Sequence, residues 1–353
     1  MTRLALVMIV RNEERTLARC IESATSSVDR VIVMDTGSQD RTLEIARALG
    51  AEVYQMEWPN DFAAARNAAL DKSDADWNLI LDADEWLASG IESLGARLLP
   101  PLGHAPPSFV GCIRIADAGQ DACQRTFLPR VLPRGVRYSG RIHEQPVTTL
   151  PRATLPVLAL HDGYDKAQLD RKKGRNEHLL REELAERPGD VYMRYQLGRQ
   201  YLIDGDNNAA AECLVAAYNA STAGTPFRHG IIIYTILALR WSLRYPEALE
   251  LVDAEHENWE DSPDFYFAVA ELYLEWAKLN IGEADQLLPV VEAAWLKCLK
   301  IGEQPSLEGS VEGSGSFRAA DNLANYYRVM GEAHRAISFA NLASDMRQLA
   351  STS

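Results

Sequence analysis

The stretch Trp77-Asn78-Leu79-Ile80-Leu81-Asp82-Ala83-Asp84-Glu85 decides the fold and points to the site, because an apolar run ends in a cluster of carboxylates. The run 77–81 predicts a buried strand, so the carboxylates that follow it are held close together. Such charges repel one another and resist burial unless a cation lies among them. One carboxylate on either side of a single residue suits Mg²⁺ or Mn²⁺, which keep waters and bind substrate phosphates. We therefore expect Asp82 and Asp84 to be metal ligands.

Apolar runs and helical patterns alternate along residues 4–82 and predict an α/β domain. The expected strands are 4–10, 31–34, 51–56 and 77–82, and the expected helices lie within 11–26, 40–49 and 62–72. Asp40 and the pair Asn60-Asp61 are suited to cap two of these helices. The alternation is typical of βαβ units with a mostly parallel sheet. Ligands of such sheets bind at the carboxyl ends of the strands, so residues 10–13, Asp35 and residues 82–84 should meet in one cleft.

The loops of this domain exclude two common classes of nucleotide site. The first turn is Arg11-Asn12-Glu13-Glu14, and no glycine-rich dinucleotide motif or P-loop lysine motif stands where it could cradle phosphate. A nucleotide bound here would need its phosphates neutralised by a metal and by side chains such as Arg66. The pattern therefore favours a nucleotide-sugar over NAD or ATP.

Several stretches together carry a family resemblance. They are Val10-Arg11-Asn12-Glu13-Glu14, residues 34–42 (MDTGSQDRT), residues 62–67 (FAAARN), Leu81-Asp82-Ala83-Asp84-Glu85, residues 138–145 (YSGRIHEQ) and residues 161–164 (HDGY). With the first four of these, residues 3 to about 87 resemble the nucleotide-binding half of family 2 glycosyltransferases of the GT-A fold, and the last two continue the resemblance. The chain is similar to the subgroup in which tetratricopeptide-like helices follow the transferase domain. That subgroup includes the peptide S-glycosyltransferases of glycosylated bacteriocins and is related to lipopolysaccharide-core glucosyltransferases.

The resemblance implies an inverting, metal-dependent glycosyltransferase whose donor is a nucleoside diphosphate sugar, with a UDP-hexose expected. Mg²⁺ or Mn²⁺ would be the cofactor. The implied donor-binding residues are Val10, Asn12, Glu13, Asp35, Arg66, Asp82, Ala83 and Arg130. Asp35 would contact the nucleoside, and Asn12 and Glu13 would complete the pocket for the base and ribose. Glu13 also suits the first turn of a helix, where a carboxylate is favourable.

The same resemblance assigns residues to the diphosphate and the metal. Arg66 and Arg130 would neutralise the diphosphate. His161 follows the apolar run 157–160 and would be the third metal ligand beside Asp82 and Asp84. The alternative for a single histidine is a hydrogen-bonded surface residue, and both interpretations remain open.

Transfer also requires a group that takes a proton from the acceptor. Glu144 is our candidate for this base, because a carboxylate next to His143 and near a metal can be tuned towards proton abstraction. A structural salt bridge is the alternative for Glu144, and Asp162 is the second candidate for the base. A cysteine acceptor would need a strong base less, since a thiolate forms near pH 8.5.

Residues 100–156 form the least regular part of the first half. Residues 108–116 and 124–132 alternate like strands, and two proline pairs at 100–101 and 106–107 mark a loop before them. In the resembling family this region carries acceptor contacts and the base. Beyond it, the basic stretch 166–181 is either a solvated helix face or a surface that contacts acceptor or membrane.

The C-terminal half is helical and repetitive. Counting 34-residue units from Val191 and again from Phe317 places small and aromatic residues at tetratricopeptide signature positions. Segments 231–256 and 263–300 look like degenerate units between them, and residues 304–315 are expected to be a mobile insertion. The predicted organisation is a GT-A domain at 1–165, a connecting helix at 166–189 and helical repeats at 190–353. The repeats could receive a peptide or glycan acceptor, or they could brace the catalytic domain or mediate a homodimer.

Composition narrows the partners. The chain has 353 residues, 47% of them hydrophobic, which supplies core for two domains. A formal charge of −14 argues against nucleic acid or an anionic membrane as the main partner. Five cysteines without Cys-x-x-Cys spacing, no signal peptide and no apolar run of membrane-spanning length favour a cytoplasmic location. An inactive binding scaffold with this fold is the alternative to an enzyme.

Overall fold

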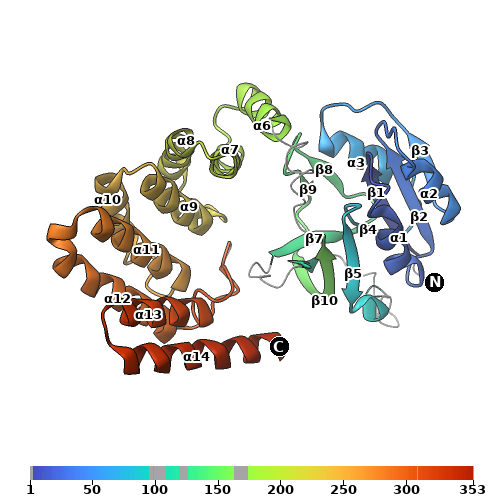
Figure 1. The fold of residues 1–353 in the computed structure, drawn as a ribbon. Coiled ribbons are helices and arrows are strands. Elements are labelled where there is room, and N and C mark those ends of the chain that lie inside the picture. The colour runs from blue at the N-terminus through green and yellow to red at the C-terminus, as the bar shows by residue number, and fades with distance from the viewer. Residues whose placement is uncertain are drawn as a thin grey trace. The chain divides into compact units, whose positions relative to one another are not determined.

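The structure is a computed structural model that describes residues 3–94, 98, 109–118, 126–162, 174–307 and 309–352. The chain forms two compact units, Met1–Glu183 and Leu184–Ser353 (Figure 1). The expected α/β domain followed by an all-α domain is confirmed. The proline pairs, Cys123, residues 163–164 of the last family stretch and most of the basic stretch 166–181 lie outside the described residues. The division between the units falls in α6 (Arg175–Glu186), inside the range for which we expect a connecting helix.

The first unit is built on an eight-stranded sheet in the order β3-β2-β1-β4-β7-β6-β10-β5. The strands are β1 (Leu4–Val10), β2 (Arg30–Asp35), β3 (Glu52–Gln55), β4 (Trp77–Ile80), β5 (Glu85–Ser89), β6 (Val110–Asp117), β7 (Thr126–Pro133) and β10 (Arg152–His161). Strands β3, β2, β1 and β4 are parallel, as expected. Strand β7 is antiparallel to β4 and β6, and β5 is antiparallel to β10. A separate pair is formed by β8 (Arg137–Ser139) and β9 (Gln145–Val147).

Side-chain capping differs among the helices that the structure describes in this unit. They are α1 (Leu17–Thr25), α2 (Thr42–Ala48), α3 (Phe62–Leu70) and the short 3₁₀ helix Ile91–Ser93. Asp61 caps α3 by accepting a hydrogen bond from the Ala64 N–H at 2.8 Å. Helix α1 starts later than its amphipathic pattern, because Asn12 takes a left-handed conformation with φ of 57° and turns the chain first.

Helices cover both faces of the sheet. On one face, α1 and α2 pack on alternate residues of β1, including Leu6 and Met8. On the other face, α3 packs on the intervening residues Ala5 and Val7. This two-sided burial explains why β1 is apolar along its whole length. With both faces of the sheet covered, polar side chains are accommodated at the carboxyl ends of the strands.

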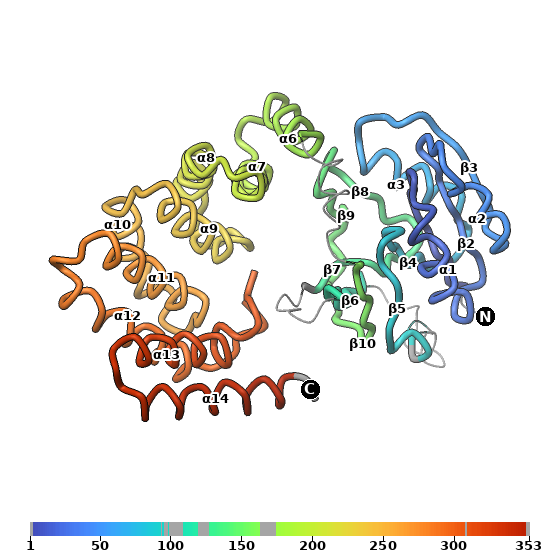
Figure 2. Tube along the Cα trace, in the orientation of Figure 1, coloured from blue at the N-terminus to red at the C-terminus, as the bar shows by residue number. Residues whose placement is uncertain are grey.

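The second unit is a series of helix pairs, and Figure 2 follows its chain path. The helices are α7 (Val191–Asp204), α8 (Asn207–Ala220), α9 (Arg228–Trp241), α10 (Tyr245–Glu255), α11 (Pro263–Leu279), α12 (Ala284–Ile301), α13 (Phe317–Val329) and α14 (Ala333–Thr352), with a 3₁₀ turn at Ile281–Glu283. Helices α7 and α13 begin at Val191 and Phe317, the first residues of the two repeats we expect. Gly198 lets α7 approach α8, because a Cβ there would lie 2.5 Å from Leu214.

The segment expected to be a mobile insertion is instead attached to the helices where the structure describes it. The Val311 N–H donates to Asp264 on α11 at 3.0 Å, and the Gly313 N–H donates to Glu303 at 3.0 Å. Ser314 is 2% exposed. These hydrogen bonds of buried polar groups hold the segment against the helices. Its glycine and serine content alone does not predict such attachment. Within the described residues, none of the helices is both long and apolar enough to cross a membrane.

Candidate functional site

The ends of β1 and β2 are joined by side chains that we expect to bind a nucleoside. Asp35 is fully buried, and its carboxylate accepts hydrogen bonds from the backbone N–H groups of Gly37 and Ser38 at 3.1 and 3.2 Å. The Asn12 N–H donates to Ser38 Oγ at 2.9 Å, and Asn12 Oδ1 accepts from the Gln39 N–H at 2.8 Å. Asp35 and Asn12 therefore fix the shape of loop 36–39. A nucleoside role for them remains a prediction.

Val10 and Glu13 belong to the same corner. The Val10 carbonyl accepts from the Thr36 N–H at 3.0 Å and from Thr36 Oγ1 at 3.1 Å. The Glu13 N–H donates to Thr42 Oγ1 at 2.7 Å, and Glu13 Oε2 accepts from Thr16 Oγ1 at 3.2 Å, just before α1. The structure thus brings the β1 and β2 loops together, and it places Glu13 before the cap residue Thr16, outside the first turn of α1.

The centre of the site is a network of two arginines and three carboxylates, in which both arginines are buried and the Asp82 side chain is 37% exposed. Arg66, from α3, donates to Asp82 Oδ1 at 2.6 Å and also to Glu144. Arg130, from β7, donates to Asp82 Oδ2 at 2.8 Å and to Glu85 Oε1 at 2.6 Å. Glu85 Oε2 in turn accepts from the Asp82 N–H at 3.0 Å. Both arginines, expected on a diphosphate, therefore neutralise protein carboxylates in this structure.

This network shifts the ionisation of its members. Burial would raise the pKa of Asp82, but the Arg130 and Arg66 guanidinium groups outweigh it and hold that pKa well below its usual value. Burial raises the pKa of Glu85 in spite of Arg130, with the nearby Asp82 charge acting in the same direction as burial. Burial also raises the pKa of Tyr138, beside Arg66, to about 12. Pairing with the two arginines therefore favours the ionised form of Asp82.

Asp84 and His161 form a second contact, next to this network. Asp84 is 8% exposed, and its Oδ2 lies 3.1 Å from His161 Nε2. His161 ends β10, where the register places it opposite Glu85 of β5 and Asp117 of β6. Its Nδ1 lies 3.6 Å from Asp117 Oδ1. The hydrogen bond to Asp84 raises the pKa of His161, although burial opposes it. Sheet order thus brings together two predicted metal ligands that are far apart in sequence.

The two candidates for the base pair with different arginines. Glu144 bonds to Arg66, and its side chain is 12% exposed. Asp162 pairs with Arg19 Nη2 at 2.8 Å with its side chain 31% exposed, and its N–H donates to the Asp84 carbonyl at 3.0 Å. The Arg19 guanidinium also lies 3.5 Å from the centre of the Trp86 ring. Both candidates are ion-paired, and the choice between them remains a prediction.

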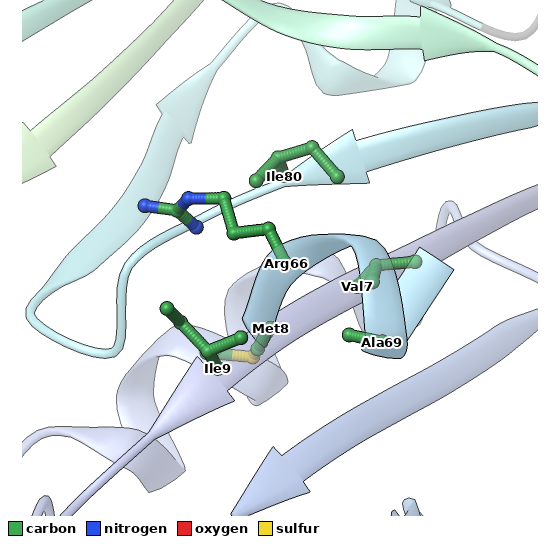
Figure 3. Close-up of a pocket in the computed structure, with 6 residues that line it drawn as sticks. All are labelled: Val7, Met8, Ile9, Arg66, Ala69 and Ile80. Carbon is green, nitrogen blue, oxygen red and sulfur yellow. The ribbon is translucent and has the colours of Figure 1, made fainter. Parts of the chain in front are cut away.

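A small hollow lies beside the network, and Arg66 lines it together with Val7, Met8, Ile9, Ala69 and Ile80 (Figure 3). The Arg66 side chain extends between Ile9 and Ile80, away from Val7. The hollow has no room for a water molecule. Arg66 Nη1 is nevertheless a buried donor without a hydrogen-bond partner in the described part of the chain. An unpaired, buried guanidinium N–H is costly to the folded state.

The donor set fits a divalent cation only in part. Asp84 and His161 supply an oxygen and an imidazole nitrogen at one point, and the carboxylate oxygen is a ligand that suits Mn²⁺ or Mg²⁺. Asp82, the other expected ligand, pairs with the two arginines. Among the described residues, no group of three or more His, Cys, Asp or Glu is placed so that it could hold a metal. The carboxylates of Asp82, Asp84, Glu85 and Glu144 still outnumber the two guanidinium groups, which favours a cation.

Sequence reasoning missed the roles of Glu85 and Asp117, and of Arg19 with Trp86. Glu85 is 3% exposed and closes the turn after β4, and its place in the Asp-Ala-Asp-Glu stretch was the available signal. Asp117 and Arg19 carry no local signal, because only the pairing of β6 with β10 and the packing of α1 against β5 bring them to the site. Ala83, expected to contact the donor, is 5% exposed between the two aspartates.

Comparison with known proteins agrees with this geometry. Residues 5–117 match the family described as Glycosyl transferase family 2. The chain is 33% identical to the TPR repeat-containing protein Synpcc7942_0270 of Synechococcus elongatus, with 73% of this chain and 68% of that protein aligned. It is 26% identical to the SPbeta prophage-derived glycosyltransferase SunS of Bacillus subtilis. That alignment covers 57% of this chain and 50% of the relative, so this chain spans about half of the relative's length.

Likeness to solved structures is weaker. Glucosyl-3-phosphoglycerate synthase from Mycobacterium tuberculosis, in complex with Mn²⁺, UDP-glucose and phosphoglyceric acid, is 24% identical over 34% of this chain and 45% of that chain. Its TM-score is 0.27, which is too low to support any inference about this chain.

Proposed function

Because the chain belongs to the family 2 glycosyltransferases, we propose that it moves a hexose from a UDP-sugar to a polypeptide or glycan acceptor, with inversion at the anomeric carbon. The observation that supports this most directly is the contact between Asp84 and His161 beside the Asp82–Arg66–Arg130 network, at the carboxyl end of β4. The network and the adjoining Asp84 contain four carboxylates and two guanidinium groups, so they suit a ligand that carries a cation. A metal-bound diphosphate is such a ligand.

Asp84 and His161 would hold Mg²⁺ or Mn²⁺. When bound, the ion acts as a Lewis acid on the leaving diphosphate. Arg66 and Arg130 keep Asp82 ionised, and the Asp82 N–H bonded to Glu85 fixes the turn that presents Asp84. The Asp162 N–H bonded to the Asp84 carbonyl joins β10 to this turn, so Asp84 and His161 keep their relative position.

In an inverting transfer the acceptor oxygen or sulfur attacks the anomeric carbon while the bond from that carbon to the diphosphate oxygen breaks. The nucleoside diphosphate leaves with the electron pair of that bond, and the acceptor proton passes to a protein base. Glu144 is the proposed base, since it is close to the network and only 12% exposed. Asp162, which adjoins Asp84 through the backbone, is the second candidate.

We propose that the helical unit recognises the acceptor. Paired helices whose small residues permit close packing, as Gly198 does against Leu214, build an extended surface of the kind that receives peptides. A polypeptide is one proposed acceptor, and a cell-surface glycan of the lipopolysaccharide type is the alternative. Deleting residues 190–353 tests the assignment. If the remaining folded domain hydrolyses the donor but modifies no acceptor, recognition belongs to the helices, whereas unchanged transfer would reduce them to a brace.

Asp84→Asn tests the metal and the donor together. The thermal midpoint of the wild type should rise with UDP plus Mn²⁺, because a ligand at a hundred times its dissociation constant adds about 2.7 kcal/mol to the free energy of unfolding. The variant should lose most of this rise and at least about 100-fold in donor hydrolysis, while its midpoint without ligand stays near the wild type.

Asp345→Asn, on the exposed face of α14, is the matched control and should behave like the wild type. Full activity of Asp84→Asn in the presence of a chelator would exclude the metal role. Calorimetry with the uridine, guanosine and thymidine diphosphates tests the nucleotide, and tighter binding of the guanosine compound would overturn the UDP-sugar assignment. Absence of any ligand-induced shift and of any turnover would favour an inactive binding scaffold.

A further inference from the structure

One buried carboxylate of the first unit lies outside the network that we assign to the reaction. Helix α6 buries Leu179, Leu180 and Glu183, so Glu183 stands where the helical periodicity favours an apolar residue. Its side chain is 3% exposed. A buried carboxylate is costly unless a cation and hydrogen bonds accompany it. The contacts of Glu183 therefore indicate what it does in the fold.

The cation beside Glu183 is Arg141, which lies between β8 and β9 (Figure 1). Glu183 Oε2 accepts from the backbone N–H of Arg141 at 3.4 Å and lies 3.5 Å from Arg141 Nε. One carboxylate oxygen thus contacts both the main chain and the side chain of the same residue. Glu183 therefore holds the Arg141 backbone in place as well as its guanidinium group.

Arg141 belongs to the segment 138–145, which is attached to α3 at two points. The Arg141 carbonyl accepts from the Phe62 N–H at 2.8 Å, at the first residue of α3. Further along α3, Asn67 Nδ2 donates to the Tyr138 carbonyl at 2.9 Å, and Asn67 Oδ1 accepts from the Tyr138 N–H at 2.8 Å. The segment is therefore held by α3 on one side and by α6 on the other.

The same segment brings Glu144, the proposed base, to Arg66 of α3. Between Arg141 and Glu144 the chain turns at His143, which takes a left-handed conformation with φ of 50°. A residue other than glycine is strained in this conformation, and it persists only where its surroundings fix it. The direction in which Glu144 leaves the turn therefore depends on how firmly Arg141 is held before it.

We propose that Glu183 is a positioning residue, which acts through Arg141 to direct Glu144 towards Arg66. This inference rests on the proposed transfer reaction, in which Glu144 takes the acceptor proton. Loss of the Glu183 charge weakens the attachment of segment 138–145 to α6, while its hydrogen bonds to α3 remain. Glu183 is also the last residue of the first unit, so the base is held from the helix that leads into the helical unit.

Glu183→Gln tests the holding of the segment without donor or acceptor. Glutamine keeps the size and one oxygen but removes the charge, so the hydrogen bond from Arg141 becomes weaker. Amide hydrogen exchange in segment 138–145 of the full chain should become about tenfold faster or more, while exchange in β1 should not change. Glu182→Gln is the matched control, because Glu182 precedes Glu183 on α6 and its side chain is 41% exposed, and it should leave all rates unchanged.

Two outcomes of this measurement contradict the inference. Unchanged exchange in segment 138–145 would show that Glu183 does not hold it. An equal acceleration in the segment and in β1 would show that Glu183 contributes only to the stability of the whole unit.

Kinetics with a hydroxyl acceptor test whether this position matters for transfer. Glu183→Gln should lower kcat by about 10- to 100-fold, the loss that a small misplacement of a reacting group causes, and leave the KM for the donor near that of the wild type. Glu144→Gln removes the group on which Glu183 acts, so adding Glu183→Gln to it should lower kcat no further. Glu182→Gln should transfer like the wild type.

The kinetic outcomes separate this inference from the proposed function. An active wild type whose kcat is unaffected by Glu183→Gln would overturn the inference alone. So would a double variant in which the two losses multiply, because Glu183 would then act independently of Glu144. A wild type without any turnover would overturn the proposed function, and the positioning role would fall with it.

Discussion

Replacing Glu144 by glutamine separates its two interpretations, a general base and a structural salt bridge. Glu144 bonds to Arg66 Nε, and its side chain is 12% exposed. Glutamine is almost the same size and keeps an oxygen that can accept from Arg66, so the substitution removes the negative charge and the proton affinity of the carboxylate. If Glu144 is the base, kcat for a hydroxyl acceptor should fall by about 10²–10⁴-fold, the usual contribution of such a group. The affinity for nucleotide should change little.

The expected cost in stability is much smaller. A hydrogen bond to a charged group contributes about 1.5–3 kcal/mol and a neutral one about 0.5–1.5 kcal/mol, so the exchange costs about 1 kcal/mol. Arg66 keeps its 2.6 Å hydrogen bond to Asp82 and is not left without a carboxylate. For a unit of this size the loss corresponds to a fall of roughly 2–4 °C in the thermal midpoint. A structural salt bridge predicts this fall with kcat retained.

Steady-state kinetics with a hydroxyl acceptor and scanning calorimetry on the same preparation measure both quantities. Asp162→Asn is the parallel variant, because Asp162 is the second candidate for the base and pairs with Arg19 instead. Wild-type kcat for Glu144→Gln at neutral pH would refute the reasoning and transfer the role to Asp162. With a thiol acceptor the loss should be much smaller and should shrink as pH rises, since the thiolate then forms without a base.

Three further predictions concern residues that stabilise the two units internally. Gly90→Ala should lower the free energy of unfolding of the first unit by about 2–5 kcal/mol in urea, because its Cβ would lie 1.8 Å from the Pro156 carbonyl oxygen and φ is +83°. Gly135→Ala is the control: φ is +91° but the space around it is open, so only the cost of the left-handed conformation should apply. Arg130→Met should lower the free energy of unfolding by about 3–5 kcal/mol, because it leaves Glu85 buried without its cation. The double variant with Glu85→Gln should regain part of this loss. If the losses of the two single variants simply add, the prediction is wrong. Burial raises the pKa of Asp264, so the protonated carboxyl contributes its full stability below the unfolded pKa of about 3.9, and this contribution is lost as pH rises through the folded pKa. Asp264→Asn should therefore weaken the pH dependence of the urea midpoint. An unchanged pH dependence would rule out Asp264 as its source.

The alternation of strands and helices in the first half was accessible from the sequence, because it depends on neighbours in the chain. Strand β1 spans the whole expected run 4–10, and the predicted cap Asp61 holds α3. Helices α7 and α13 start at the first residues of the expected repeats. Strands β5, β8 and β9 were not expected, since each is short and lacks a periodic pattern that could be told from a loop.

The sequence by itself determined which residue types stand at the ends of the strands, and so which chemistry the site can perform. Only the tertiary structure decided how those residues are paired. Asp82 was expected to bind a metal, but it lies between Arg66 and Arg130, which are contributed by α3 and by an antiparallel strand inserted next to β4. His161 reaches Asp84 because β10 pairs with β5 at one edge of the sheet. Hydrogen bonds within strands and helices follow local periodicity, whereas ion pairs between distant segments depend on strand order and side-chain conformation, for which the sequence contains no local signal.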